Sequence, residues 1–193
     1  LHGAVERYEQ VLQLLPGQEG AVADLVSLSK QEEVSEQAAT LVRPHLEDHG
    51  RWQDLATVLD ARAGLSQDPE EVLGALRELA QVRHEKLGDA AGALEATMKL
   101  IDQSPAEELA NPLQAAMRLA GELDGLDALI DELGKRANDD SRYPEVRVAI
   151  ALSAAYAASD YLGDPDKALA VLVPLLDAEL ADLSVCERIE ELA

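Results

Sequence analysis

Apolar residues recur along this chain with the spacing of one helix face. Between residues 126 and 137 they occupy positions i, i+3, i+4, i+7 and i+11, and similar series run through 52–63 and 72–87. Such spacings predict amphipathic α-helices, and no stretch sustains the alternation that predicts a strand. We therefore expect an all-α protein of about 10–11 helices, at residues 2–15, 19–29, 34–49, 51–64, 69–87, 90–103, 106–121, 124–137, 144–162, 166–179 and 182–192.

Three of the expected helices begin at a recognisable sequence. Asp68-Pro69 and Asp164-Pro165 place an acidic residue before a proline, and Ser104-Pro105-Ala106-Glu107 has the S-x-x-E arrangement of a capping box. Proline is tolerated at the first helical position because its missing N–H would have no partner there. The Asp or Ser oxygen accepts a hydrogen bond from another first-turn N–H. These sequences predict helix N-termini.

Sequence segments also recur along the chain. Leu87-Gly88-Asp89 returns as Leu162-Gly163-Asp164, and the apolar pattern of 52–59 returns, at nearly the same offset, at 126–133. Repetition at a nearly fixed offset is typical of helical-repeat proteins, in which each unit buries its apolar face against its neighbours.

The first repeat is longer than the second. Pro16 precedes Trp52 by 36 residues, whereas Pro105 precedes the equivalent Leu126 by 21. The difference of 15 residues (36 − 21) corresponds to about four helical turns. We therefore expect one additional helix between Pro16 and Trp52.

A small residue, a bulky one four positions later and a proline twelve positions after the small one are typical of the second helix in the tetratricopeptide family. The units that resemble this pattern are Ala4, Tyr8 and Pro16; Ala93, Thr97 and Pro105; and Ala168 and Leu172, which lack the proline. Two weaker units have Leu55 with Leu59 and Leu129 with Leu133. The chain departs from the family in having longer units and in lacking the aromatic-and-glycine pattern of the first helix. Another type of α-solenoid is the alternative.

The resemblance implies a right-handed superhelix of tandem helical hairpins with a concave groove that binds proteins. We expect one such segment over residues 1–193, with repeat boundaries near 16/17, 65/68, 104/105 and 140/143. Counted from the tetratricopeptide register, the groove-facing residues are Glu78, Val82, Glu85, Gln114, Arg118, Ser153 and Asp160.

Composition and charge narrow the class of partner. The chain is 47% hydrophobic but only 3% aromatic, and its leucine and alanine favour helices. Acidic residues outnumber basic ones 38 to 16, which gives a formal net charge of −22. Such a chain repels nucleic acid and anionic lipid surfaces. It favours a protein partner with a basic or amphipathic segment, although solubility also explains an acidic surface.

Candidate chemical sites are weak. Cys186 is the single cysteine, so neither an intrachain disulfide nor a thiolate metal cluster is possible. His45 and His49 have the i, i+4 spacing of metal ligands, but they lack a third ligand, and Pro44 disturbs their helix. The Asp-rich runs around Asp139 and at 160–166 lack the glycine and closing glutamate of a calcium loop. We expect no metal site, no cofactor and no enzymatic activity.

Three further features of the sequence bear on packing, on membrane association and on the extent of the chain. Trp52, the single tryptophan, is expected to pack in the core, and an exposed contact for a partner is the alternative. The longest apolar run without a charge, 148–159, is too short to span a bilayer. Because Leu1 is followed almost at once by a helical pattern, we expect a segment of a longer protein. The compartment stays open, with the cytoplasm favoured.

The function expected from the sequence is that of a non-enzymatic scaffold or adaptor that binds a segment of a partner protein in an acidic-to-polar groove. The alternative is a structural spacer or self-assembly segment of a larger repeat protein, for which self-association would be the relevant interaction.

Overall fold

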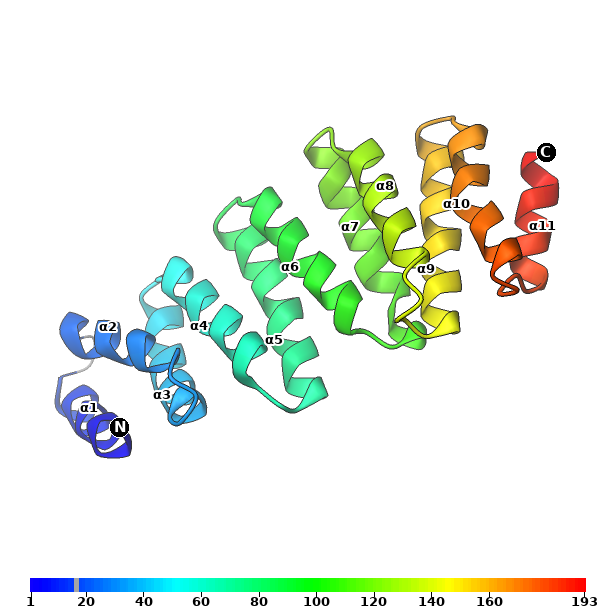
Figure 1. The fold of residues 1–193 in the computed structure, drawn as a ribbon. Helices are drawn as coiled ribbons and strands as arrows, with labels where there is room; N and C mark the ends of the chain where they lie inside the picture. The colour runs from blue at the N-terminus through cyan, green and yellow to red at the C-terminus, as the bar shows by residue number, and fades with distance from the viewer. Residues whose placement is uncertain (16–17) are drawn as a thin grey trace. The chain divides into compact units, whose positions relative to one another are not determined.

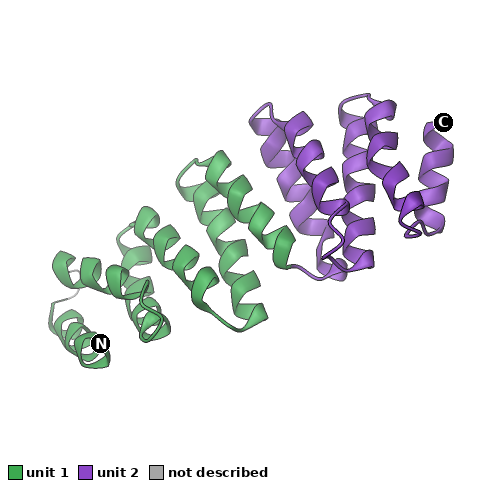
Figure 2. Ribbon diagram, viewed as in Figure 1, with its two compact units in different colours: residues 1–103 green, residues 104–193 purple. Residues whose placement is uncertain are grey.

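The chain is all-α. The computed structural model describes residues 1–15 and 18–193, which form eleven α-helices and no strand (Figure 1). The contacts divide the chain into two compact units, residues 1–103 (unit 1) and 104–193 (unit 2), and each is described by itself (Figure 2). Pro16 and the expected boundary near 16/17 lie outside the described residues. The two units divide between residues 103 and 104, and residues 66–68 and 138–143 lie between helices. The repeat boundaries near 65/68, 104/105 and 140/143 stay predictions.

Unit 1 contains six α-helices in its described residues, within about two residues of the expected bounds. They are α1 (His2–Leu14), α2 (Glu19–Leu28), α3 (Ser35–Asp48), α4 (Trp52–Leu65), α5 (Pro69–Gln81) and α6 (Ala90–Gln103). α5 continues directly into a π-helical segment, η1 (Val82–Lys86), so the expected helix 69–87 is one α-helix followed by a wider turn.

Unit 2 contains five α-helices and two short helical segments. They are η2 (Ala106–Glu108, a 3₁₀ turn), α7 (Ala110–Glu122), α8 (Leu126–Ala137), α9 (Pro144–Tyr156), η3 (Ala157–Tyr161, a π-helical segment), α10 (Pro165–Asp177) and α11 (Leu183–Leu192).

The expectation of one helix over 106–121 was wrong at its start. Residues 106–108 form the 3₁₀ turn η2, and the α-helix begins only at Ala110. Pro112 explains the break. In a continuous α-helix the nitrogen of Pro112 would donate to the carbonyl of Glu108, but proline has no N–H. Pro112 instead sits in the first turn of α7, where no donor is needed.

The two Asp-Pro helix starts are confirmed. Asp68 accepts a hydrogen bond from the N–H of Glu70 at 3.0 Å, and Asp164 accepts one from Lys167 at 2.9 Å. Asp182 caps α11 in the same way, because it accepts from Val185 N–H. The hydroxyl of Ser184, together with that N–H, lowers the pKa of the Asp182 carboxyl. Each such cap satisfies an N–H that would otherwise lack a partner.

Residues that are equivalent in the sequence repetition form equivalent backbone hydrogen bonds at the ends of their helices. Gly88 and Gly163, which are equivalent in the repetition, have φ of +64° and +67°. Asp89 N–H donates to the Arg83 carbonyl, and the equivalent Asp164 N–H donates to the Ala158 carbonyl. Both Leu-Gly-Asp turns therefore close a π-helical segment with the same backbone geometry.

The turn before α4 recurs before α8. Arg51 N–H donates to the Leu46 carbonyl at 2.8 Å, and the equivalent Gly125 N–H donates to Ala120 at 2.8 Å. The left-handed residue is Gly50 in the first turn, at φ +64°, but Asp124 in the second, at φ +53°. A residue with a side chain is strained in this region, where glycine is not.

Helices two apart in the sequence meet in unit 1. α1 contacts α3, and α2 contacts α4. Arg43 of α3 forms an ion pair with Glu78 of α5, and Lys99 of α6 lies 3.1 Å from Asp60 of α4. The unit thus has two rows of helices, α1–α3–α5 and α2–α4–α6, which Figure 1 shows within residues 1–103.

The additional helix expected before Trp52 is confirmed. Two α-helices, α2 and α3, precede α4, whereas α7 is the one α-helix between η2 and α8. The extra helix changes the row of α1. Ala4 of α1 is equivalent to Ala93 of α6 in the repetition, but α1 lies in the row of α3 and α5, not in the row of α6.

Leucine and alanine fill the core of each unit. The largest fully buried side chains include Leu25, Leu46, Leu55, Leu79 and Ile101 in unit 1 and Ile130, Leu133, Ile150, Leu172 and Leu175 in unit 2. Each such burial stabilises the fold by about 1.5–3 kcal/mol.

Two cations, Arg147 and Lys167, join helices in unit 2. Arg147 of α9 is 7% exposed, donates from Nε to the Ala137 carbonyl at the end of α8, and pairs with Asp140 at 2.7 Å. A cation at a helix C-terminus stabilises the carbonyls that lack intrahelical donors. The ammonium of Lys167 of α10 reaches Asp127 and Asp131 of α8 at 2.6 and 2.7 Å.

Substitutions in the two equivalent turns should change the free energy of unfolding in opposite directions. Gly50→Ala should lower the free energy of unfolding by about 1 kcal/mol, and Asp124→Gly should raise it by about 0.5–1 kcal/mol, because only glycine adopts positive φ without strain. Urea denaturation measures both, with Trp52 fluorescence following Gly50→Ala in unit 1 and helical circular dichroism following Asp124→Gly in unit 2.

Gly74→Ala is the matched control for these variants. Gly74 lies within α5, and a Cβ there would meet no atom within 4 Å, so alanine should stabilise by about 0.5–1 kcal/mol. Destabilisation by Asp124→Gly would contradict the left-handed turn before α8.

Candidate functional site

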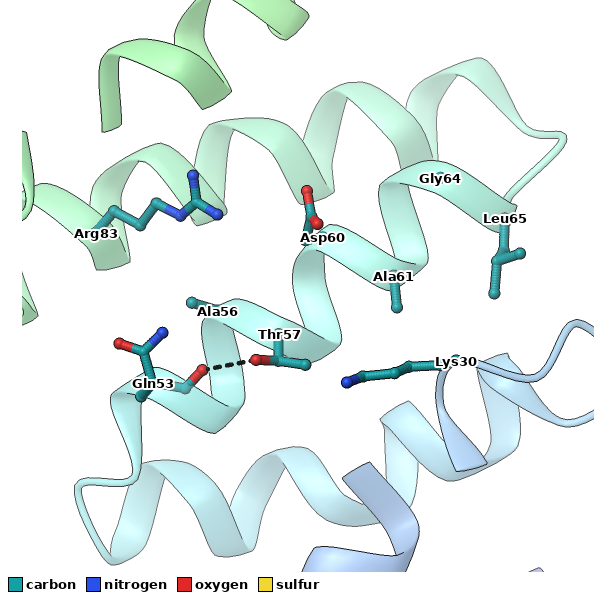
Figure 3. Close-up of a pocket in the computed structure, with 9 residues that line it drawn as sticks. All are labelled: Lys30, Gln53, Ala56, Thr57, Asp60, Ala61, Gly64, Leu65 and Arg83. Carbon is teal, nitrogen blue, oxygen red and sulfur yellow. Dashed lines mark hydrogen bonds between the residues drawn. The ribbon is translucent and has the colours of Figure 1, made fainter. Parts of the chain in front are cut away.

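Three open hollows indent the surface of unit 1. The first follows one face of α4 and has a volume of about 490 Å³ (Figure 3). The second, about 440 Å³, lies between α4, α5 and α6, and the third, about 830 Å³, lies between α1 and α3. We call them the α4 hollow, the α4–α6 hollow and the α1–α3 groove.

The α4 hollow exists because α4 carries small side chains on one face. Gln53, Ala56, Thr57, Asp60, Ala61 and Gly64 follow at helical spacing and line it. Lys30 extends in from the chain after α2, and Arg83 does so from η1 (Figure 3). The hydroxyl of Thr57 donates to the carbonyl of Gln53 at 3.0 Å, within its own helix. Apart from Leu65, the lining is therefore made of alanine, glycine and polar side chains.

Two of the charged groups around the α4 hollow, Arg83 and Asp60, already have partners on α6. Arg83 donates to the Gly92 carbonyl at 2.9 Å and lies 3.7 Å from Glu95. Asp60 accepts from Lys99, and this hydrogen bond raises the pKa of the Lys99 ammonium. These contacts hold α6 against α4 and η1, so they position the walls of the hollow.

The α4–α6 hollow lies on the other side of Asp60. It shares Asp60 and Gly64 with the α4 hollow, and Lys99, Asp102 and Gln103 of α6 form its polar wall. Val72 and Leu76 of α5 give it an apolar base. α4 therefore presents open, mostly polar surface on both sides of the Asp60–Lys99 ion pair.

The α1–α3 groove is more acidic. Glu6 and Glu9 of α1 face it together with Glu36 of α3, and all three are exposed. Val5, Leu41 and Pro44 supply its apolar lining, and Gln37, Thr40 and His45 complete it. Carboxylates around an apolar lining favour a ligand that carries both cationic and apolar groups.

The three groove residues predicted in unit 1 differ in their surroundings. Val82 is 6% exposed and packs in the core, so the prediction that it faces a partner is corrected. Glu78 is half-buried and bonded to Arg43, as part of the tie between α3 and α5. Glu85 is exposed and accepts a hydrogen bond from Gln81 at 3.0 Å, so its carboxylate faces solvent.

The four groove residues predicted in unit 2 lie on α7, α9 and η3. Gln114 and Arg118 are exposed, and Arg118 lies 3.9 Å from Glu122 on its own helix. Ser153 is half-buried. Asp160 pairs with Arg188 of α11 at 2.6 Å, so it ties the last helix to η3. A role of these side chains in partner binding stays a prediction.

The histidine pair and the acidic loop take part in local structure. His49 Nδ1 lies 2.8 Å from the carbonyl oxygen of His45, within one helical turn. The hydroxyl of Ser141 donates to Asp139 and lowers the pKa of that carboxyl, while Asp140 pairs with Arg147. The described residues contain no group of three or more side chains that could hold a metal ion.

Trp52 is half-buried and packs against the core of unit 1, as expected. The ammonium of Lys86 lies 5.1 Å from its ring centroid, a cation–π contact. Trp52 therefore joins the start of α4 to η1.

Comparison with known proteins gave no match, either to a family model, to a curated protein or to a solved structure. None of the helices in residues 1–15 and 18–193 is both long and apolar enough to cross a lipid bilayer.

Sequence reasoning missed all three hollows. A partial signal was present for the α4 hollow, because Ala56, Ala61 and Gly64 leave one face of an amphipathic helix without bulk. For the α1–α3 groove the signal was Pro44, which had been noted only as a disturbance to the helix. The partners across each hollow come from other helices, and helical periodicity does not identify them.

The different surroundings of Glu78 and Glu85 predict different effects of reversing their charge. Glu78→Lys should lower the free energy of unfolding by about 1 kcal/mol, because the new ammonium would face Arg43. Glu85→Lys should leave stability within about 0.5 kcal/mol, since an exposed substitution away from a network has little effect. Urea denaturation followed by Trp52 fluorescence measures both. Equal destabilisation by the two variants would contradict the Arg43–Glu78 tie.

Proposed function

We propose that this chain is a non-enzymatic protein-interaction module that holds a basic or amphipathic segment of a partner protein. The observation that carries the proposal is the distribution of charge. Acidic residues outnumber basic ones 38 to 16. Many of the basic side chains already form ion pairs or hydrogen bonds with a neighbouring helix. Among the described residues, the cations that join different helical elements include Arg43, Arg62, Arg83, Lys99, Arg147, Lys167 and Arg188.

Carboxylates therefore dominate the surface that remains for a partner. Exposed acidic side chains with little cationic compensation attract a basic segment and speed its encounter. Apolar contacts beneath them then lengthen the lifetime of the complex. The α1–α3 groove and the α4–α6 hollow both combine acidic with apolar lining, which supports an amphipathic ligand.

The tetratricopeptide resemblance supports the same function. Its anchor positions Ala93 and Thr97 in unit 1 and Ala168 and Leu172 in unit 2 are buried, as packing anchors of stacked hairpins would be. Helical hairpins that stack on their neighbours form extended concave surfaces suited to a polypeptide. We propose that the two units belong to such a solenoid.

A panel of fluorescent peptides tests the proposal. A peptide alternating lysine with leucine should bind, whereas peptides alternating serine or glutamate with leucine should not, because only the first offers cations to the carboxylates. Fluorescence anisotropy at increasing salt should show affinity falling as screening grows. Equal binding of the serine and lysine peptides would reject a charge-selective module.

A second candidate function is self-assembly within a larger repeat array. Exposed apolar side chains at the end of unit 2 favour it, namely Val173 and Leu176 of α10 and Leu183 of α11, the last 73% exposed. Light scattering over a wide concentration range separates the candidates. The self-assembly function predicts a mass that rises with concentration and that falls back to the monomer in Leu176→Lys with Leu183→Lys. A constant monomer mass would reject it.

A further inference from the structure

The α1–α3 groove offers mainly hydrogen-bond acceptors. Glu6 and Glu9 lie one helical turn apart on α1, and Glu36 lies on the opposite wall in the first turn of α3. In the described part of the chain, no lysine or arginine lies within ion-pair distance of these three carboxylates. The groove therefore presents negative charge from both walls.

Pro44 adds a backbone acceptor to one wall. It lies inside α3, and its nitrogen carries no hydrogen, so the carbonyl oxygen of Thr40 lacks its α-helical donor. Thr40 and Pro44 both line the groove and are exposed. A partner N–H that reached the Thr40 carbonyl would supply the hydrogen bond that Pro44 cannot.

The lining between the walls is apolar. Val5 is 5% exposed, and Leu41 is half-buried and packs against the core of unit 1. The aliphatic stems of lysine and arginine cover such a surface while their charged ends reach neighbouring carboxylates. From Glu36 to His45 the α3 wall runs for about 13 Å, which an extended segment of about four residues would span.

We propose that the α1–α3 groove docks an extended, lysine- or arginine-bearing segment of a partner protein, whose cations bond Glu6, Glu9 and Glu36 and whose apolar side chains cover Leu41 and Pro44. This inference rests on the proposed function and assigns it a place and a ligand chemistry. The contrast with the α4 hollow supports the choice, because there Asp60 and Arg83 are already bonded to α6.

Charge argues against other occupants. A second copy of this chain also carries a formal charge of −22, so two copies repel each other. Nucleic acid and anionic lipid would bring phosphates against the three carboxylates. A basic polypeptide segment is the occupant whose charge complements the groove.

The test compares two triple variants with the same change in net charge. The groove variant is Glu6→Gln with Glu9→Gln and Glu36→Gln. The control is Asp177→Asn with Glu187→Gln and Glu190→Gln, which are exposed residues of unit 2. Both raise the formal charge from −22 to −19 (−22 + 3), so a general attraction of cations would be weakened equally.

Binding of the lysine–leucine peptide is measured by fluorescence anisotropy. The groove variant should bind roughly tenfold more weakly than the wild-type chain, since three exposed ion pairs are lost. The control variant should change the affinity by less than about twofold, because long-range charge is screened at physiological salt. Equal weakening in the two variants would overturn the groove while leaving the charge-selective function standing. Absence of binding to the wild-type chain would overturn both.

Thr40→Lys provides a second variant that does not depend on removing three side chains. It places an ammonium inside the groove at an exposed helical position, where lysine is a better helix former than threonine. Circular dichroism should show an unchanged helix content, and the peptide should bind at least about fivefold more weakly through charge repulsion. Unchanged affinity in this variant would place the peptide elsewhere on the chain.

Discussion

The burial of leucine and alanine between consecutive helices is the interaction on which the rest of each unit depends. None of these helices is long, and helices this short are marginal in water without tertiary packing. Each one is stabilised by an apolar face that its neighbours cover, and the small alanines let helices such as α9 pack closely. The cations then connect helices two apart, as Arg43 does in unit 1. The hollows lie where small side chains leave space between helices that these contacts hold in place.

Helix positions could be predicted from the sequence because their signals are local. Asp68 and Asp164 lie within one helical turn of the N–H groups they cap, and the apolar spacing needs only one helix at a time. The extra helix before α4 followed from counting residues. The start of α7 was missed because the missing donor of Pro112 outweighed the capping sequence before it.

The surroundings of the predicted site residues could not be derived in the same way. Glu78 bonds Arg43, which lies far back along the chain on another helix, and a helical register contains no information about such a contact. Val82 begins a π-helical segment, and the wider turn changes which side chains face the core after α5. The α1–α3 groove depends on the packing of α1 beside α3, which the additional helix brings about.

That additional helix has a consequence for how such chains diversify. In an array of two alternating rows, inserting two helices leaves every other helix in its original row. Inserting one helix moves all helices on one side of the insertion to the opposite row. α1 and α6 are counterparts in the sequence repetition but belong to different rows, so the same sequence pattern meets different neighbours within unit 1. A change in length by one helix is thus enough to redirect a face without altering any residue on it.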